Sequence, residues 1–128
     1  MKKYILILIV LTSLSVSTAE AKEQPSGIAE PFRIEATAYC YGEITKDGSK
    51  VREGICAGRE EWLGKTCIMY ESDNGKTGDL IGIYEIKDTG GDYRLKNGKC
   101  VDIYIPSEDE CLEFGRKDVF VQIIDAKG

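Results

Sequence analysis

Two aspartates in the second half of the chain stand where carboxylates can do chemistry. Asp88 opens the stretch "DTGG", and Asp102 lies inside the strand-like run "CVDIYI". Aspartate is a poor strand residue, and burying its charge without a partner costs free energy. Two carboxylates in one groove are the usual equipment for cleaving a glycosidic bond, and a carboxyl among apolar groups has a raised pKa suited to a general acid. From the pattern alone, an ordinary exposed acid is the simpler interpretation of either residue.

The neighbours of the two aspartates suggest a groove for a carbohydrate. After Asp88, the Thr89 hydroxyl and the glycines Gly90 and Gly91 allow backbone amides to approach a ligand closely. Four aromatic side chains offer flat faces for sugar rings: Tyr39, Trp62, Tyr93 and Tyr104.

The composition argues against a metal or a catalytic thiol, and we expect no cofactor. The chain has no histidine, and its five cysteines lack the close pairs typical of zinc ligands. Without a histidine to activate a thiol, the cysteines are expected to be small buried residues. Export permits one or two disulfides, and because five is odd, at least one thiol should be free.

The 128 residues are enough for one domain after an N-terminal signal. A basic start, an apolar run and the small-residue box "AEA" predict a secretory signal peptide over residues 1–21, followed by a polar linker over 22–31 and the domain over 32–128. Cleavage would leave 15 basic and 21 acidic residues, a net charge of −6. That charge argues against binding nucleic acid or anionic lipid, and we expect no stable membrane insertion after cleavage.

Hydrophobic patterns predict a mainly β fold, a small barrel with one or two short helices. Strands are expected at residues 32–40, 55–58, 66–70, 80–88, 100–105 and 118–125. A helical turn should end at Gly64, and a short helix at 107–114 has Ser107 as N-cap, Glu110 as capping-box partner and Gly115 as its stop. In strand 100–105, alternation places Asp102 on the face opposite Val101, which in a closed barrel can line a groove.

Several motifs together resemble the three-aspartate ("3D") domain of membrane-bound lytic transglycosylase A and related secreted cell-wall proteins. The C-terminal half carries the most specific of them, "DTGG", "VDIY" and "EFGRKDVFVQII". The stretches "ATAYC" at 36–40, "TKDG" at 45–48 and "LGKT" at 63–66 also match, so that the resemblance covers residues 32–125.

The resemblance implies a six-stranded double-psi β-barrel that binds peptidoglycan glycan strands outside the cytoplasm, associated with the cell wall and acting as a monomer. It implies cleavage between N-acetylmuramic acid and N-acetylglucosamine without water, leaving 1,6-anhydro ends. Asp102 matches the family's catalytic aspartate, and Asp88 matches the second one. We further expect these residues to contact substrate: Thr37, Tyr39, Thr45, Glu60, Glu61, Thr89, Gly90, Gly91 and Tyr104.

The family's first aspartate has no counterpart in this chain. An ungapped count back from Gly64 reaches Ala57, and Gly58 and Arg59 follow it. Glu60 or Glu61 would have to supply the missing acid, and both are expected, with Arg59, to line the groove.

Other functions remain open at this stage. The missing aspartate favours a glycan-binding barrel that does not cleave, and two carboxylates also suit a hydrolytic glycosidase. A cysteine-rich interaction module or inhibitor would fit the small size and the cysteines alone. An aspartic protease shares "DTG", but the chain has one such motif, and the hydrophobic context that precedes it in proteases is missing.

Overall fold

The structure, a computed structural model, describes residues 29–125. The predicted signal peptide at 1–21 and most of the linker lie outside these residues. No helix between residues 29 and 125 is long and apolar enough to cross a membrane.

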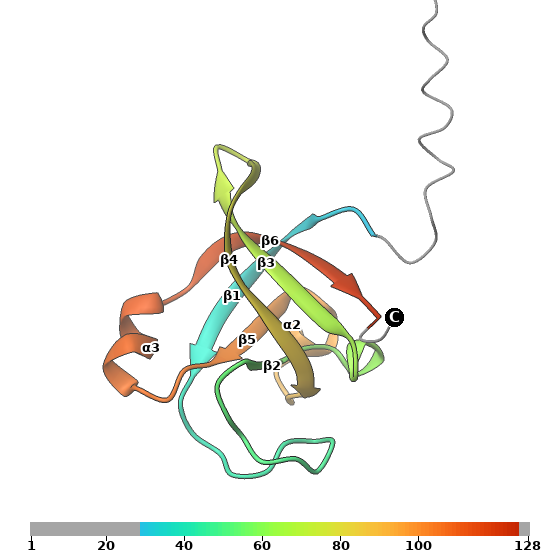
Figure 1. Ribbon diagram of the computed structural model, residues 1–128, viewed down its shortest axis with the longest axis vertical. Helices are drawn as coiled ribbons and strands as arrows, with labels where there is room; N and C mark the ends of the chain where they lie inside the picture. Colours follow the sequence, from blue (N-terminus) through green and yellow to red (C-terminus); the bar gives the residue numbers. More distant parts are fainter. Residues whose placement is uncertain (1–28, 126–128) are drawn as a thin grey trace, which may run out of the picture.

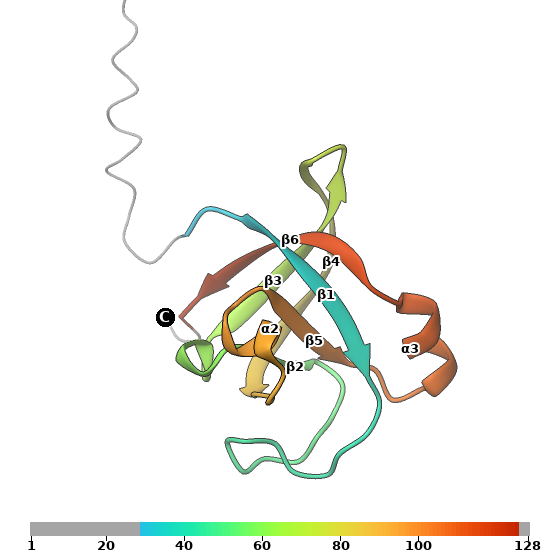
Figure 2. The same ribbon diagram turned by 180° about the vertical axis from the view of Figure 1, so that it is seen from behind.

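Six strands close into a barrel, as the sequence predicts (Figures 1 and 2). In chain order they are β1 (Phe32–Tyr39), β2 (Ile55–Ala57), β3 (Thr66–Asp73), β4 (Lys76–Asp88), β5 (Cys100–Tyr104) and β6 (Lys117–Ile124). Around the barrel the order is β1-β5-β2-β4-β3-β6. Pairs β1/β5 and β2/β4 are parallel, and the other neighbours are antiparallel. The pattern is unchanged when the first three strands are exchanged with the last three, as expected of a double-psi barrel.

Three short helical segments connect the strands. The 3₁₀ turn η2 (Glu60–Trp62) and helix α3 (Glu108–Phe114) lie where the sequence predicts them. The Ser107 hydroxyl caps α3 by accepting the Glu110 backbone N–H at 3.2 Å, and Gly115 ends it with a φ of +62°. Helix α2 (Tyr93–Lys96), in a segment expected to be a loop, was not predicted because four residues are too few to show a helical period.

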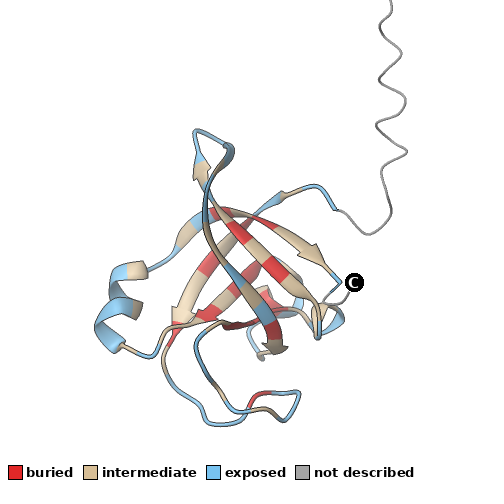
Figure 3. Cartoon of the chain, in the orientation of Figure 1, coloured by how far each residue is buried: buried red, intermediate tan, exposed pale blue. Residues whose placement is uncertain are grey.

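The barrel interior is filled by the alternating apolar residues of the strands (Figure 3). In β5, Val101 and Ile103 are buried, and Asp102 between them is only partly buried on the opposite face. In β1, Arg33, Glu35 and Thr37 at alternate positions are not buried, whereas Tyr39, the next residue on that face, is only 7% exposed. Its ring packs edge-on against Tyr104 at a centroid distance of 5.4 Å.

All five cysteines are free thiols, so the expectation of one or two disulfides is wrong and that of at least one free thiol is confirmed. Cys56, Cys67 and Cys100 are buried, as small apolar core residues should be. A contact with the Cys67 thiol, together with burial, raises the pKa of Cys56 well above its ordinary value. Burial likewise raises the pKa of Cys111. These shifts favour the neutral thiol in both cases.

The core makes a direct stability prediction. Ile86 in β4 is fully buried, whereas Ile83 in the same strand is 59% exposed. Ile86→Ala should therefore lower the free energy of unfolding by about 2–5 kcal/mol. Ile83→Ala should cost about 1 kcal/mol or less, the span of strand propensities. Urea unfolding monitored by circular dichroism measures both, and equal losses would contradict the packing described here.

Candidate active site

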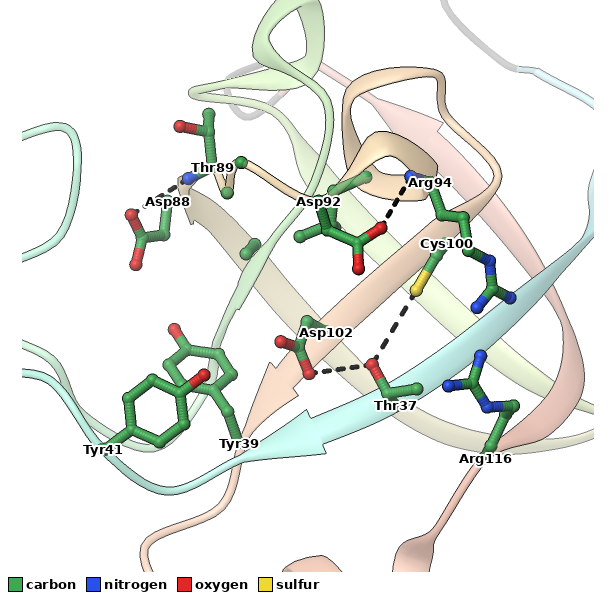
Figure 4. A pocket seen from close by; sticks show the side chains of 14 residues that line it. Thr37, Tyr39, Tyr41, Asp88, Thr89, Asp92, Arg94, Cys100, Asp102 and Arg116 are labelled. Atoms are coloured by element: carbon green, nitrogen blue, oxygen red, sulfur yellow. Dashed lines mark hydrogen bonds between the residues drawn. The ribbon is translucent and has the colours of Figure 1, made fainter.

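A cavity of about 390 Å³ lies between the barrel and the segment that joins β4 to β5 (Figure 4). This volume falls in the range of pockets for small ligands. Its lining comes from β1, β2, β5, the "DTGG" turn, α2 and the residue before β6. The lining residues are Thr37, Tyr39, Tyr41, Ala57, Asp88, Thr89, Gly90, Gly91, Asp92, Arg94, Leu95, Cys100, Asp102 and Arg116.

The strand register explains why Asp88 and Asp102 share this cavity. Thr37 of β1 pairs with Asp102 of β5, Asp102 pairs with Ala57 of β2, and Ala57 pairs with Asp88 of β4. These four positions form a row across four neighbouring strands. The two aspartates are thus two strand spacings apart, roughly 10 Å between Cα atoms. Ala57 lies between them and adds no acid.

Asp102 is held in an environment that favours its protonated form. The Thr37 hydroxyl donates a hydrogen bond to its carboxylate at 2.9 Å. Burial raises the pKa of Asp102, and the Thr37 hydrogen bond partly opposes that rise. The negative charges of Asp92 and then Asp88 raise the pKa further. A partly buried carboxyl with a raised pKa is suited to giving up a proton to a ligand.

Asp88 ties the wall of the cavity together. One of its carboxylate oxygens accepts the backbone N–H groups of Thr89 and Lys46, both at 2.9 Å. The first of these contacts is within the glycine turn, and the second reaches the long loop between β1 and β2. Asp88 therefore fixes the turn against that loop and leaves its other oxygen without a protein hydrogen bond among residues 29–125. This geometry suits a residue that positions the site.

Tyr39 brings a buried hydroxyl to the cavity. The hydroxyl has no hydrogen-bond partner within the part of the chain that the structure describes. Figure 4 shows it pointing toward the side of the pocket that holds Asp88 and Asp102. Burial, followed by the charges of these two aspartates, raises the pKa of Tyr39 well above its usual value. The hydroxyl therefore remains protonated.

At the glycine turn, only one of the two glycines is required by packing. A Cβ on Gly90 would come within 2.6 Å of the Leu95 side chain, whereas a Cβ on Gly91 would meet no atom within 4 Å. Gly90 therefore lets α2 pack against the turn, and Thr89 and Gly91 stand beside it in the lining.

Four of the expected substrate contacts lie outside this cavity. The buried Thr45 hydroxyl instead donates to Asp47 at 2.7 Å and stabilises its own loop. Tyr104 lines a separate cavity of about 300 Å³ on the α3 side of the barrel. Glu60 and Glu61 line a third cavity of about 270 Å³.

Neither glutamate lines the cavity that contains Ala57. The cavity lined by Glu60 and Glu61 shares two lining residues, Thr89 and Gly90, with the cavity that contains Asp102. Glu61 is paired with Arg59 at 3.0 Å, and Arg59 does not line either cavity. Of the other aromatic candidates, Trp62 packs on Phe32, and Tyr93 is exposed on α2.

The sequence analysis missed three charged residues of the site. Asp92 caps α2 by accepting the Arg94 backbone N–H at 2.7 Å, and its carboxylate supplies the third acid of the cavity. Arg94 and Arg116 supply positive charge. The one sequence signal for this helix was Asp92 itself, because aspartate is a favoured N-cap residue. Nothing local indicated that Arg116 would reach the same cavity.

Comparison of the chain with protein-family models gave no match, and comparison with curated proteins gave none either. No group of three histidine, cysteine or acidic side chains within residues 29–125 is arranged to hold a metal ion.

The pKa of Asp102 has a consequence for stability. Because the folded-state pKa is raised by burial, the folded protein loses stability as the pH rises from about 4, where an unfolded aspartate titrates, through that raised value. Asp102→Asn removes the charge. The variant should be more stable than the wild type at pH 7, and the difference should vanish near pH 3. Thermal unfolding over this pH range measures the effect, and a difference independent of pH would contradict it.

Proposed function

We propose that this protein is a secreted peptidoglycan-cleaving enzyme, a lytic transglycosylase of the 3D-domain type. The observation that carries the proposal is the partly buried Asp102, whose pKa is raised in a cavity of ligand size. The resemblance of "DTGG" and "VDIY" to the family supports it, because their two aspartates line one cavity.

In this mechanism Asp102 acts first as acid and then as base. Its carboxyl gives a proton to the bridging oxygen while the bond from that oxygen to C1 of N-acetylmuramic acid breaks. Positive charge develops on the sugar at this step. The Asp102 carboxylate then takes the proton of the sugar's own 6-hydroxyl, and the 6-oxygen bonds to C1 to close the anhydro ring. The proton count balances without water, and one carboxyl is enough.

The other acids support this step by charge and position. The carboxylates of Asp92 and Asp88 raise the pKa of Asp102, so that it holds its proton at a higher pH. The same charges favour the positive charge that develops on the sugar. The Tyr39 hydroxyl is buried beside these aspartates, has no hydrogen-bond partner among residues 29–125, and adds no negative charge because its pKa is raised.

Two alternatives have specific support. A hydrolytic glycosidase would use both Asp88 and Asp102, which line one cavity. The absence of an acid at Ala57 favours a barrel that binds glycan without cleaving it. Product analysis separates all three, since an anhydro end is lighter than a hydrolysed end by one water.

Asp102→Asn is the principal test. It keeps the shape of the side chain but removes the proton that must move, so release of anhydro-muropeptides should fall by about 10²-fold or more. Binding to insoluble peptidoglycan should remain. Asp79→Asn is the matched control, because Asp79 is exposed near the β3–β4 turn and does not line the cavity. Mass spectrometry of the released muropeptides measures both variants. Wild-type protein that binds but releases nothing would support the binding alternative.

Asp88→Asn should have a smaller effect of a different kind. Its amide oxygen can still accept the Thr89 and Lys46 N–H groups, so the turn should keep its position. Loss of the negative charge lowers the pKa of Asp102, and the alkaline limb of the pH–rate profile should move to lower pH. Rates measured from pH 4 to pH 9 test this shift. An unmoved profile would exclude charge coupling between the two aspartates.

A further inference from the structure

The end of the cavity beyond Thr37 carries two arginines around a single carboxylate. Arg94 comes from α2, and Arg116 lies just before β6. The Arg116 guanidinium donates to Oε1 of Glu35 in β1 at 3.1 Å, and the Arg94 guanidinium contacts the same oxygen. Figure 4 shows the two guanidinium groups turned toward each other, on the far side of Thr37 from Asp102.

This arrangement leaves positive charge and hydrogen-bond donors unused. Each guanidinium carries several N–H donors in a planar fork, and two such groups share one carboxylate. The local charge of the three side chains is therefore net positive, in a chain whose overall charge is −5. Arg116 is 54% exposed, so its donors remain accessible from the cavity. The two arginine side chains thus lie on the far side of Thr37 from Asp102, and Asp92 lines the same cavity at the start of α2.

An anionic group on the ligand would match this pair of arginines. Since both arginines line the same cavity as Asp102, that anion must be attached close to the bond being cleaved. In a peptidoglycan strand the acid nearest to this bond is the lactyl carboxyl of muramic acid. It is a neutral amide where a stem peptide is attached and a free carboxylate where the peptide has been removed. The carboxylates of the stem peptide itself lie two or more residues further out, at up to about 3.3–3.6 Å per residue.

We propose that Arg94 and Arg116 form a carboxylate subsite that selects muramic acid with a free lactyl group. The preferred substrate is then a glycan strand without stem peptides. Planar guanidinium groups bind carboxylates through paired hydrogen bonds, which gives direction as well as charge. The inference rests on the proposed function and adds the substrate class. It also implies that an amide-hydrolysing reaction, which removes the peptide from the lactyl group, must supply this substrate.

The first test uses the wild-type protein and three forms of the same glycan strands. One form bears stem peptides, one has free lactyl carboxylates, and one has those carboxylates converted to methylamides. The free carboxylate form should be cleaved with a kcat/KM about tenfold or more above either neutral form, the ratio expected for a charge-assisted hydrogen bond. The methylamide form distinguishes an effect of charge from an effect of size, because it is neutral like the peptide-bearing form but nearly as small as the free carboxylate.

The second test removes the arginines one at a time. Arg94→Gln and Arg116→Gln should each lower kcat/KM for free-carboxylate strands about tenfold more than kcat/KM for methylamide strands. Arg33→Gln is the matched control, because Arg33 also lies on the barrel surface and pairs with an aspartate, Asp118, but is not part of the cavity. It should leave the preference intact.

The outcomes separate this proposal from the one on which it rests. Wild-type cleavage of all three forms at equal rates, or a preference for peptide-bearing strands, would overturn the carboxylate subsite and leave the transglycosylase intact. Failure to cleave or bind any of the three would overturn the proposed function and the subsite with it. Because the substrate comparison uses unmodified protein, it tests the subsite even if an arginine variant folds poorly.

Discussion

The parallel pairing of β5 with β1 is the constraint on which the cavity depends. It sets Thr37 directly opposite Asp102, so that a hydroxyl meets the carboxylate that the barrel partly buries. The same strand β5 pairs on its other edge with β2, which places Ala57 beside Asp102 and, through β4, brings the turn at Asp88 into line. A shift of one residue in this register would send Asp102 into the apolar interior, where an unpaired carboxylate is far more costly.

The site is therefore a compromise between folding and chemistry. Burial that raises the pKa of Asp102 opposes folding at neutral pH, and the Thr37 hydrogen bond offsets only part of that opposition. The Tyr39 hydroxyl, which has no hydrogen-bond partner among residues 29–125, is a second polar group in the same buried wall. Both groups lie against an apolar core that is fully buried across β2, β3, β4, β5 and β6, which can sustain a local loss of stability.

Much of this fold follows from local patterns in the sequence, and the site follows only in part. Period-two alternation predicted the six strands and placed Asp102 off the apolar face, and cap residues predicted α3. The ends of β3 and β4 were not predicted, because both strands continue into the turn-rich residues 71–79. Arg94 and Arg116 escaped prediction because barrel closure, rather than any local pattern, brings α2 and the start of β6 to one cavity. Thr45 and Glu61 do not line this cavity, for the opposite reason. Their side chains satisfy neighbours two residues away, Asp47 and Arg59, and such local contacts do not show in a motif match.

The interleaving of the two halves of the chain bears on how the protein reaches its native state. β1 has both of its sheet partners, β5 and β6, in the second half of the sequence, and β2 lies between β4 and β5. Neither half can form a closed sheet from its own strands, so an emerging N-terminal half exposes strand edges until the last strand has been made. Such long-range pairing delays folding to the millisecond-to-second range of barrel proteins. Assembly is consequently a late, cooperative event that requires the whole chain, and a fragment ending before β6 would keep the open edges of β1 and β3.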